Sequence, residues 1–426
     1  MKIGILGCGL SGLAVGSHLK SDFEIIEKED SPGGLLRSEK IDGYVFDTGG
    51  SHILFSRNRD VLSEMLRFMP RAIRHTRRTY IFYEGRYLKY PFENGIYALS
   101  PEQRYEILLD FIGNIVKKRM KPRNLEDFFV MKFGKKMTEM YFKPYNEKLW
   151  RMDMNEIAID WIWERVPNPP VEDILRSLVG LETDGYLHQM IFYYPHEGGF
   201  ESFVQNMTKP ISDRVKLGEE AKHIKFEDGK IIVETHIERA YDKLISTIPL
   251  PVLGKIVGGE MEELVDKLRY NSVTVVGLGV RGNFPNFHWI YVPQKEIPFY
   301  RVAFLHNYSP AMAPENRATI IAEISHRPDE RIRDPVENVV EGLEKMGFKF
   351  DVDVERYWLN KYAYVVYDSN RKKVVDRIKK LLEEMGIVIA GRFGSWEYMN
   401  MDEIWLNAKI VANKVDLHES AAGNTQ

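Results

Sequence analysis

The feature that most constrains the fold is a glycine-rich turn near the start of the chain. Residues 2–6 are apolar enough to form a buried strand, the sequence Gly-Cys-Gly-Leu-Ser-Gly follows at 7–12, and a helical stretch runs on to Lys20. A second short apolar run ends on Glu27. A G-x-G-x-x-G turn between a strand and a helix, with an acidic residue about twenty residues further on, is typical of a dinucleotide-binding α/β fold.

Each residue of this motif has a physical task in holding a dinucleotide. Gly7 permits the tight turn, Gly9 lets the backbone approach a pyrophosphate, and Gly12 lets the helix pack closely against the strand. The helix N-terminus presents free N–H groups to the phosphates. Glu27 lies where a carboxylate can accept hydrogen bonds from both hydroxyls of an adenosine ribose. The alternative is a glycine-rich turn without a ligand.

Composition narrows the possible functions. The chain has 426 residues and 44% of them are hydrophobic, which suits a globular protein with one large core or two to three subdomains. With 59 basic and 62 acidic residues the formal net charge is −3, so there is no electrostatic case for binding nucleic acid. The single cysteine, Cys8, excludes an intrachain disulfide, and no ligand spacing of histidines or cysteines predicts a metal site.

The chain also lacks the patterns of a secreted or membrane protein. It contains no signal-peptide pattern, and no apolar run reaches the length of about 18 residues that a transmembrane helix needs. We therefore expect a soluble, cytoplasmic protein. The oligomeric state stays open.

Strand and helix patterns predict a discontinuous dinucleotide-binding domain within an α/β fold. Short apolar runs at 243–247 and 386–391 resemble buried parallel strands, and an Asp-Gly turn predicts a hairpin over 221–236. We expect this Rossmann-like domain to consist of residues 1–60, 195–255 and 361–426, with a final helix over 401–414. The remaining residues predict a helical substrate domain, 95–194, and a mixed-sheet substrate domain, 61–94 and 256–360.

A second block of glycines extends the motif. The sequence Ser-Pro-Gly-Gly-Leu-Leu-Arg stands at 31–37, and Gly-Tyr-Val-Phe-Asp-Thr-Gly-Gly stands at 43–50. This block resembles the extended signature of FAD enzymes of the amine oxidase and protoporphyrinogen oxidase superfamily, which NAD-dependent dehydrogenases do not usually carry. Gly34 would let the chain pass close to the dinucleotide, and Arg37 could face the pyrophosphate as a fixed cation. The alternative for Arg37 is a solvated surface arginine.

Seven later segments carry a narrower resemblance: Tyr-Pro-Phe-Glu-Asn at 90–94, Lys-Pro-Tyr-Asn-Glu-Lys-Leu-Trp at 143–150, Trp-Ile-Trp-Glu-Arg-Val at 161–166, Trp-Ile-Tyr-Val-Pro at 289–293, Pro-Phe-Tyr-Arg at 298–301, Asn-Tyr-Ser-Pro at 307–310 and Gly-Arg-Phe-Gly-Ser-Trp-Glu-Tyr at 391–398. They resemble segments of the UDP-galactopyranose mutases, particularly the eukaryotic type. The resemblance extends along the whole chain, and the spacing inside each segment is retained. The chain departs from the eukaryotic pattern at Glu93, where an amide side chain is usual, and at Ser51, which is added between a glycine and a histidine.

The resemblance implies an isomerase in which flavin does no net redox work. In this family N5 of reduced FAD attacks the anomeric carbon of a UDP-sugar, UDP leaves, and the opened sugar recloses with the other ring size. It therefore implies interconversion of UDP-galactopyranose and UDP-galactofuranose, or of a related UDP-sugar, by FAD that is active when reduced. NAD(P)H or another reductant would be a partner. The runner-up is an amine oxidase-like or protoporphyrinogen oxidase-like FAD oxidoreductase, and a third possibility is a non-catalytic nucleotide-binding platform.

Two arginines distinguish these possibilities, because a leaving UDP group carries two phosphate charges. A guanidinium is always charged and binds phosphate oxygens in a fork, whereas an oxidase for an apolar substrate gains little from such a pair. The resemblance assigns Arg165 and Arg301 to the diphosphate; the alternative is that they form structural ion pairs. Phenol groups donate to phosphate without adding charge, and the tyrosines at the corresponding positions are Tyr291, Tyr308, Tyr364 and Tyr398.

The same resemblance implies contacts to the base and to the flavin. Phe92 and Tyr141 match positions that sandwich uracil, with Asn146 and Trp150 in the substrate pocket, although aromatic residues at such spacing can equally form core. His52 after Gly50 matches a loop that lies against the isoalloxazine. The C-terminal block implies cofactor contacts from Gly391, Arg392 and Met401, with Arg392 helping to hold the anionic reduced flavin.

Overall fold

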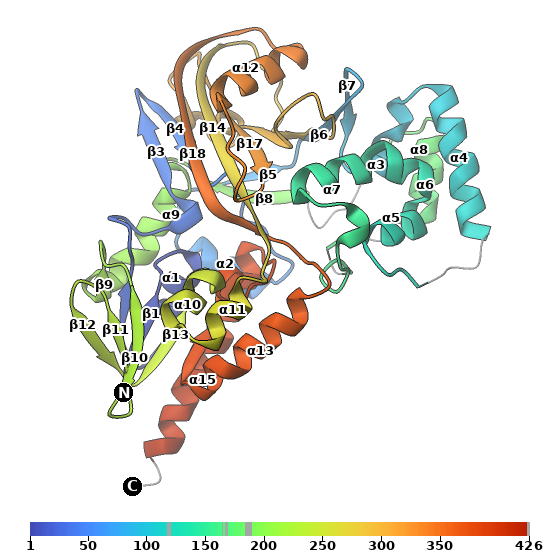
Figure 1. The fold of residues 1–426 in the computed structure, drawn as a ribbon. Helices are drawn as coiled ribbons and strands as arrows, with labels where there is room; N and C mark the ends of the chain where they lie inside the picture. Colours follow the sequence, from blue (N-terminus) through green and yellow to red (C-terminus); the bar gives the residue numbers. More distant parts are fainter. Residues whose placement is uncertain (117–120, 164, 167–168, 184–189, 424–426) are drawn as a thin grey trace.

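The computed structural model describes residues 1–116, 121–163, 165–166, 169–183 and 190–423, and it is built on two main sheets with a helical region beside them (Figure 1). The first sheet is parallel throughout, in the order β19-β13-β1-β2-β9. Its central strands β1 and β13 are buried at every residue after the first, as expected for a sheet that is covered on both faces. This sheet confirms the predicted α/β fold. Its strands are β1 (Lys2–Leu6), β2 (Asp22–Ile26), β9 (Val215–Lys216), β13 (Lys243–Ser246) and β19 (Ile387–Ile389).

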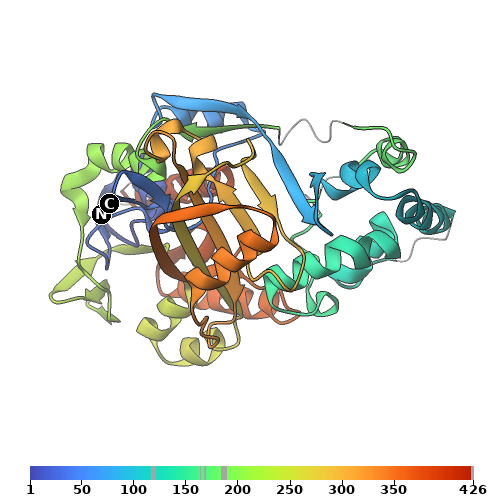
Figure 2. The ribbon, with the colours of Figure 1, turned by 90° about the horizontal axis from the view of Figure 1, so that it is seen from above.

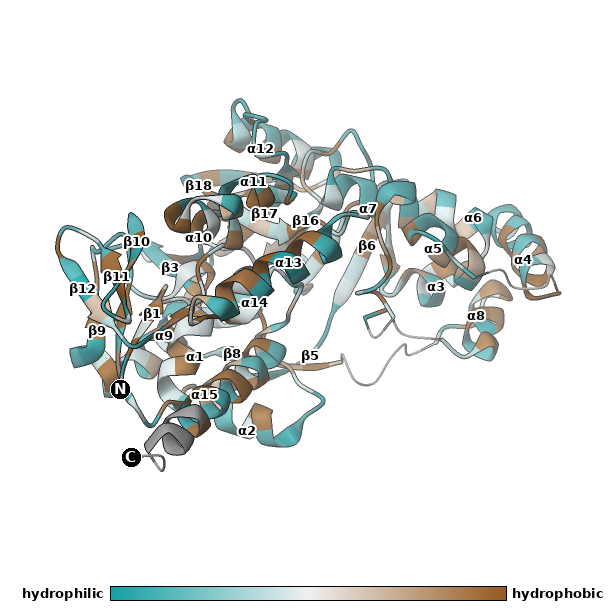
Figure 3. Ribbon diagram, turned by 60° about the horizontal axis from the view of Figure 1, so that its bottom comes forward, coloured by the Kyte–Doolittle hydropathy of each residue, from teal (hydrophilic) through white to brown (hydrophobic). Residues whose placement is uncertain are grey.

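Helices with one apolar side cover this sheet. α1 (Leu10–His18) follows the glycine turn and packs against α15 (Met401–Gly423). Figure 3 shows apolar and polar residues on both α13 (Arg371–Glu384) and α15. The predicted final helix is nine residues longer than expected, 401–423 rather than 401–414, because no proline or glycine interrupts the sequence before Gly423. The other helices are α2 (Arg59–Leu66), α9 (Gly199–Thr208), α10 (Leu250–Val257), α11 (Glu260–Val265), α12 (Pro335–Lys345) and α14 (Gly391–Gly394).

The predicted hairpin is confirmed as part of a small antiparallel sheet. β10 (His223–Glu227) pairs with β11 (Lys230–Glu234), which pairs with β12 (Glu238–Tyr241). The two turn residues, Asp228 and Gly229, have φ of 49° and 74°. A two-residue turn of this hand matches the twist of the strands that it joins, which is why Asp-Gly favours it.

The second main sheet has seven strands in the order β18-β14-β17-β16-β15-β6-β7. All its pairs are antiparallel except β15 with β6. β18 runs five residues beyond the domain boundary expected at 360. The strands are β6 (Thr79–Tyr83), β7 (Arg86–Lys89), β14 (Tyr270–Gly282), β15 (Trp289–Tyr291), β16 (Arg301–Phe304), β17 (Ala318–His326) and β18 (Phe350–Val365); two smaller sheets pair β3 (Ser38–Ile41) with β4 (Tyr44–Asp47) and β5 (Ala72–Thr76) with β8 (Ile191–Pro195).

The helical region projects away from the end of the molecule that holds both termini, as Figures 1 and 2 show. One of its helices changes its hydrogen-bonding pattern along its length. A π-helical turn over Thr138–Phe142 follows α6 directly and leads directly into α7. Single π-turns inside α-helices are frequent at functional sites. The helices are α3 (Phe92–Gly95), α4 (Pro101–Val116), α5 (Leu125–Phe133), α6 (Lys135–Met137), α7 (Lys143–Trp150) and α8 (Val171–Leu178).

Close approach explains two of the motif glycines. A Cβ on Gly12 would lie 1.9 Å from the carbonyl oxygen of Gly7, so α1 can start there only without a side chain. A Cβ on Gly391 would lie 1.9 Å from Ser11 Oγ, and Gly391 also has a φ of +73°. The two glycines thus let α1 pack against the end of β1 on one side and against α14 on the other.

We expect Gly391→Ala to lower the free energy of unfolding by about 1–3 kcal/mol more than Gly347→Ala does, because of overpacking against Ser11. Gly347 is the matched control: its φ is +90°, and an added Cβ would meet no atom within 4 Å. Urea denaturation of both variants measures the difference. Equal losses would contradict the clash.

Candidate functional site

One cavity of about 1140 Å³ extends from the glycine turn into the helical region. At one end it is lined by the carboxyl ends of β1 and β2, where ligands of open α/β sheets bind. At the other end it is lined by side chains of α3, α5, α7 and β15. Residues of the proposed cofactor site and of the proposed substrate site therefore share a single space.

The glycine-turn end of the cavity is organised around Glu27. Gly7, Gly9 and Gly34 line it together with Glu27 and Arg37. The Glu27 carboxylate accepts hydrogen bonds from the backbone N–H of Cys8 at 2.7 Å and of Glu29 at 3.0 Å, which fix it at the cavity wall. Arg37 lies 3.4 Å from Glu29 and is one-third exposed. Gly12 is placed behind the wall, in the helix–strand contact.

The C-terminal block supplies buried polar atoms at the cavity. Arg392 donates from Nη2 to the carbonyl of Ala363 at 2.9 Å, whereas its buried Nε has no hydrogen-bond partner among the described residues. Asp402 likewise has one buried oxygen, Oδ1, without a partner in the described part of the chain. Such orphaned groups are costly unless a ligand satisfies them. Met401 lines the cavity beside them, so this wall fits a polar cofactor with both acceptors and donors.

Gly50 and Gly391 do not line the cavity but shape the backbone behind it. Gly50 has a φ of +100°, and an added Cβ would lie 3.1 Å from the carboxyl carbon of Glu323. Gly391 donates its N–H to Asn407 Oδ1 at 2.8 Å. Gly50 lies two residues before His52 and Gly391 lies directly before Arg392, and both His52 and Arg392 line the cavity.

His52 is a neutral ring at neutral pH. Burial, together with the positive charges of Arg301 and Arg392, lowers the pKa of His52 to about 4. Its Nδ1 lies 3.0 Å from the carbonyl oxygen of Gly50, a contact that requires the proton on Nδ1 and leaves Nε2 as an acceptor. The same two cations that oppose a charge on His52 favour an anion beside it.

Arg301, at the start of β16, forms a fork with Glu323 of β17. Its Nε and Nη2 each donate to the carboxylate at 2.8 Å. Nη2 also lies 3.2 Å from the carbonyl oxygen of Ser51. Among the described residues no hydrogen bond uses Nη1, and Arg301 lines the cavity with a side chain that is 20% exposed. The ion pair and the cavity position, which the sequence presents as alternatives, therefore occur together.

Arg165, like Arg301, both forms an ion pair and lines the cavity. Its Nη2 pairs with Glu403 at 2.9 Å and donates to the carbonyl oxygen of Tyr398, while the guanidinium lies 4.3 Å from the centre of the Tyr398 ring. The side chain is 18% exposed and lines the cavity. The C-terminal segment thus holds Arg165 across the cavity wall.

Tyrosines line the wall around the arginines. Tyr364 and Tyr398 stack with their ring centres 6.2 Å apart, and Tyr364 OH lies 3.0 Å from Tyr300 OH, which donates to Glu323. Tyr291 lines the same cavity. Tyr308 differs from the expectation: it is fully buried and not at the wall, with its OH 2.7 Å from Ser51 Oγ. The seryl residue added in this loop separates Tyr308 from the cavity.

Phe92 and Tyr141, the pair expected to sandwich uracil, leave no slot between their rings in this structure. The two rings stack on one another, with centres 4.8 Å apart and planes at 11°. A third ring between them needs about 7 Å, twice the contact distance of about 3.5 Å. The π-helical turn carries Tyr141 into this position, and the stack continues to Tyr145 at 5.6 Å.

Asn146 and Trp150 line the cavity as expected, and they also bond to each other. Trp150 Nε1 donates to Asn146 Oδ1 at 3.2 Å, and Asn146 Nδ2 donates to the carbonyl oxygen of Phe142 at 2.7 Å. Trp150 packs edge-on against Tyr364 at 5.6 Å. α7 therefore presents a pre-ordered aromatic face to the cavity.

Sequence reasoning missed Glu323, which joins the parts of the site. Its carboxylate accepts from Arg301, from Tyr300 OH and from the backbone N–H of Ser51 at 3.0 Å, and its residue is 2% exposed. The one available signal was its place in the run Ile-Ile-Ala-Glu-Ile at 320–324, where a single carboxylate interrupts apolar residues. A buried carboxylate requires such partners.

Behind the site lies a second buried histidine, His288, which accepts a hydrogen bond at Nδ1 from the backbone N–H of Arg78 at 3.0 Å. Burial, with the positive charges of Arg78 and His75, lowers the pKa of His288 to about 2. Below the unfolded pKa of about 6.5 the unfolded chain binds a proton that the folded chain does not, so stability falls as pH falls from 6.5.

We expect His288→Asn, which keeps an acceptor but does not titrate, to reduce the slope of unfolding free energy against pH. The reduction is about 1.4 kcal/mol per pH unit between pH 6 and 4. Urea denaturation at a series of pH values measures the slope. An unchanged slope in the variant would show that His288 does not titrate in this way.

Two further searches concern the described residues only. They contain no group of three histidine, cysteine, aspartate or glutamate side chains that could hold a metal ion. No helix within them is both long and apolar enough to span a bilayer.

The chain is similar to one protein family as a whole and to individual known proteins over parts of its length. A family model described as flavin containing amine oxidoreductase matches residues 10–415. Coproporphyrinogen III oxidase of Staphylococcus aureus is 22% identical over 290 residues, 58% of this chain and 60% of that protein. An uncharacterized protein of Methanocaldococcus jannaschii is 36% identical over 69 residues, 16% of this chain and 18% of that protein. The chain therefore spans less than two thirds of the length of either relative.

The fold matches a solved enzyme more completely. A crystal structure of reduced UDP-galactopyranose mutase superposes with a TM-score of 0.90 at 26% identity, over 97% of this chain and 93% of that one. Both main sheets and the helical region belong to the shared architecture, since almost the whole chain is covered.

Proposed function

The chain belongs to the flavin-containing amine oxidoreductase family, and within it we propose a flavin-dependent nucleotide-sugar mutase. The reaction is the interconversion of UDP-galactopyranose and UDP-galactofuranose, or of a related UDP-sugar. The observation that carries the proposal is the pair Arg165 and Arg301 on the wall of the same cavity as the glycine turn. The likeness to the reduced mutase structure supports it.

FAD is the proposed cofactor; Gly7, Gly9, Glu27 and Gly34 would hold it at one end and Arg392 and Met401 at the other, since all six line the cavity. In its reduced form it supplies a nucleophilic ring nitrogen. The partnerless Nε of Arg392 fits an electron-rich acceptor on such a group. The partnerless Oδ1 of Asp402 fits a hydroxyl donor.

The chain's own residues then bind and stabilise the departing diphosphate. Arg301 keeps its orientation through Glu323, with Nη1 left for a phosphate oxygen. Arg165 adds a second fixed cation, held by Glu403. Such preorganised charges stabilise developing negative charge without reorganising during the reaction. His52 stays neutral between Arg301 and Arg392, so it adds no competing positive group and can accept a proton only at Nε2.

The aromatic wall excludes water from the sugar. Tyr364, Tyr398 and Trp150 pack against each other along the cavity, and the two tyrosines offer hydroxyl donors to phosphate. Exclusion of water matters because an activated sugar would otherwise be hydrolysed. The walls of this cavity therefore suit group transfer within one substrate.

The test uses purified protein with its flavin. We expect conversion of UDP-galactopyranose to the furanose form after reduction by dithionite, followed by chromatography, and no conversion while the flavin is oxidised. Absence of conversion in the reduced state would refute the interconversion of UDP-galactopyranose and UDP-galactofuranose.

The second candidate function is an oxidoreductase, favoured by the similarity to coproporphyrinogen III oxidase. Its signature is oxygen-dependent turnover of a porphyrinogen or an amine without a nucleotide sugar. Such turnover, with no sugar conversion, would establish the oxidoreductase in place of the mutase. The arginines on the cavity wall favour the anionic nucleotide sugar over an amine, which would carry a positive charge.

A further inference from the structure

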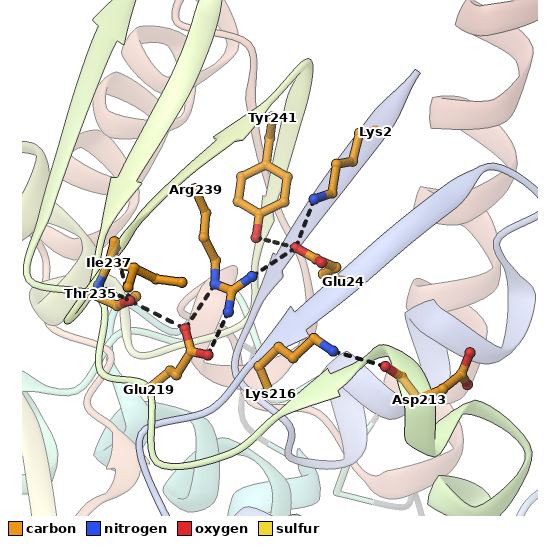
Figure 4. A network of polar contacts seen from close by, with 9 residues as sticks. All are labelled: Lys2, Glu24, Asp213, Lys216, Glu219, Thr235, Ile237, Arg239 and Tyr241. Atoms are coloured by element: carbon orange, nitrogen blue, oxygen red, sulfur yellow. Dashed lines mark hydrogen bonds and ion pairs between the residues drawn. The ribbon is translucent and has the colours of Figure 1, made fainter.

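Figure 4 shows a network of charged side chains that connects β12 with β1 and β2. One of its members, Glu219, lines the cavity. At the centre of the network Arg239, in β12, forms a fork with Glu219: Nη2 donates to Oε1 at 2.6 Å and Nε to Oε2 at 2.8 Å. Glu219 is 7% exposed and accepts a further bond from Thr235 Oγ1 at 3.2 Å. The Arg239 side chain is 14% exposed. A planar fork of this kind fixes both partners in orientation as well as in distance.

The network reaches from the small sheet to the parallel sheet. Arg239 Nη1 lies 3.4 Å from Glu24 of β2, which also accepts from Tyr241 OH at 3.0 Å and pairs with Lys2 of β1 at 3.0 Å. Two acids thus face two bases. The hydrogen bond from Arg239 lowers the pKa of Glu219, as an ion pair requires.

Glu219 also belongs to the segment that closes the cavity beside Glu27. Residues 219–221 line the cavity. Backbone hydrogen bonds attach this segment to the loop after β2 on one side and to β11 on the other. The N–H groups of Gly218 and Glu219 donate to the carbonyl oxygens of Glu29 and Glu27, at 3.0 and 2.8 Å, and Lys222 N–H donates to Glu234 at 2.8 Å. Arg239 itself stands outside the cavity lining, so its influence passes through Glu219.

Charge explains why the fork matters for this segment. Without the guanidinium, Glu219 would be a nearly buried carboxylate close to Glu24 and on the same chain segment that bonds to Glu27. A buried charge without a counterion is strongly unfavourable, and the group moves towards water instead. Movement of Glu219 towards water would displace the backbone that lines the cavity next to the ribose-directed acid.

We propose that Arg239 is a positioning residue for the adenosine half of FAD, which it does not touch, through its fork with Glu219 and the cavity-lining segment 219–221. The inference rests on the FAD binding within the proposed function and not on the mutase step. The flavin half of the cofactor would be held towards Arg392, which makes no contact with this network.

The experiment separates the two halves of the cofactor. Apoprotein of the wild type and of Arg239→Gln is titrated with FAD, with ADP as a probe of the adenosine half, and with FMN as a probe of the flavin half. We expect the dissociation constants for FAD and ADP to rise about tenfold in the variant. The constant for FMN stays within about twofold of wild type.

Two variants test the route through Glu219. The double variant Arg239→Gln/Glu219→Gln removes the unpaired carboxylate and is expected to recover most of the lost FAD affinity. Arg377→Gln is the matched control, because Arg377 forms a similar two-bond pair with Glu260, at 3.0 and 2.9 Å, away from the cavity lining. It should leave all three constants unchanged.

Three outcomes would overturn the proposal. They are FAD and ADP affinities in Arg239→Gln equal to those of Arg377→Gln, a loss of FMN affinity as large as that of ADP, and no recovery in the double variant. A wild-type chain that binds FAD but converts no nucleotide sugar would refute the mutase and leave this inference standing. A wild-type chain that binds no FAD would refute both.

Discussion

We expect Arg301→Lys to weaken UDP binding by about 30-fold or more while the flavin content stays unchanged. Lysine keeps a positive charge opposite Glu323, so the buried carboxylate remains compensated. A compact ammonium that pairs with Glu323 has no second nitrogen in a fixed fork for a phosphate oxygen, unlike the guanidinium with its unused Nη1. Loss of a partner from a charged, largely desolvated contact costs about 2–5 kcal/mol, which corresponds to this factor at its lower end.

Isothermal titration of UDP into wild type and variant measures the change, and the flavin absorbance of the same samples gives cofactor content. Arg317→Lys is the matched control, since Arg317 pairs with Asp353 at 2.7 Å and does not line the cavity. UDP affinity in Arg301→Lys within twofold of the control would remove Arg301 from the diphosphate site.

The second large effect concerns stability. Glu323→Ala should lower the free energy of unfolding by about 3–5 kcal/mol, because it leaves Arg301 as a largely buried cation without its counterion. It also removes the acceptor for Ser51 N–H and Tyr300 OH. Urea denaturation followed by far-ultraviolet circular dichroism measures the loss.

Glu330→Ala is the control for this variant. Glu330 pairs with Arg151 at 3.1 Å, but it is 39% exposed, so its removal should cost less than about 1 kcal/mol. The double variant Glu323→Ala/Arg301→Met should recover part of the loss, because no unpaired charge remains. A Glu323→Ala protein as stable as the Glu330→Ala protein would contradict the argument.

Local patterns in the sequence were sufficient to predict the dinucleotide-binding fold. The turn at Gly7, Gly9 and Gly12 and the acid at Glu27 belong to one strand–helix–strand unit, so their spacing along the chain reflects their spacing in the structure. The Asp228–Gly229 turn is local in the same way. Such features depend on backbone conformation, which neighbouring residues determine.

Contacts between distant segments could not be predicted in this way. Glu323 receives a hydrogen bond from Ser51, 272 positions away, and Arg165 pairs with Glu403, 238 positions away. The resemblance to a family indicated which arginines matter but not which acids hold them. The closed stack of Phe92 on Tyr141 depends on the exact rotation of the helix that carries Tyr141, which apolar spacing does not determine.

The π-helical turn at Thr138–Phe142 has a consequence for how the site tolerates length changes. One additional residue in a helix rotates everything beyond it by about 100°, since a full turn takes 3.6 residues. The π-helical turn therefore sets the rotation of α7, which carries Asn146 and Trp150, about its axis relative to α6, which packs within the helical region. Deleting a single residue there would leave both helices intact in length and hydrogen bonding while turning the cavity-facing side chains of α7 towards its neighbours.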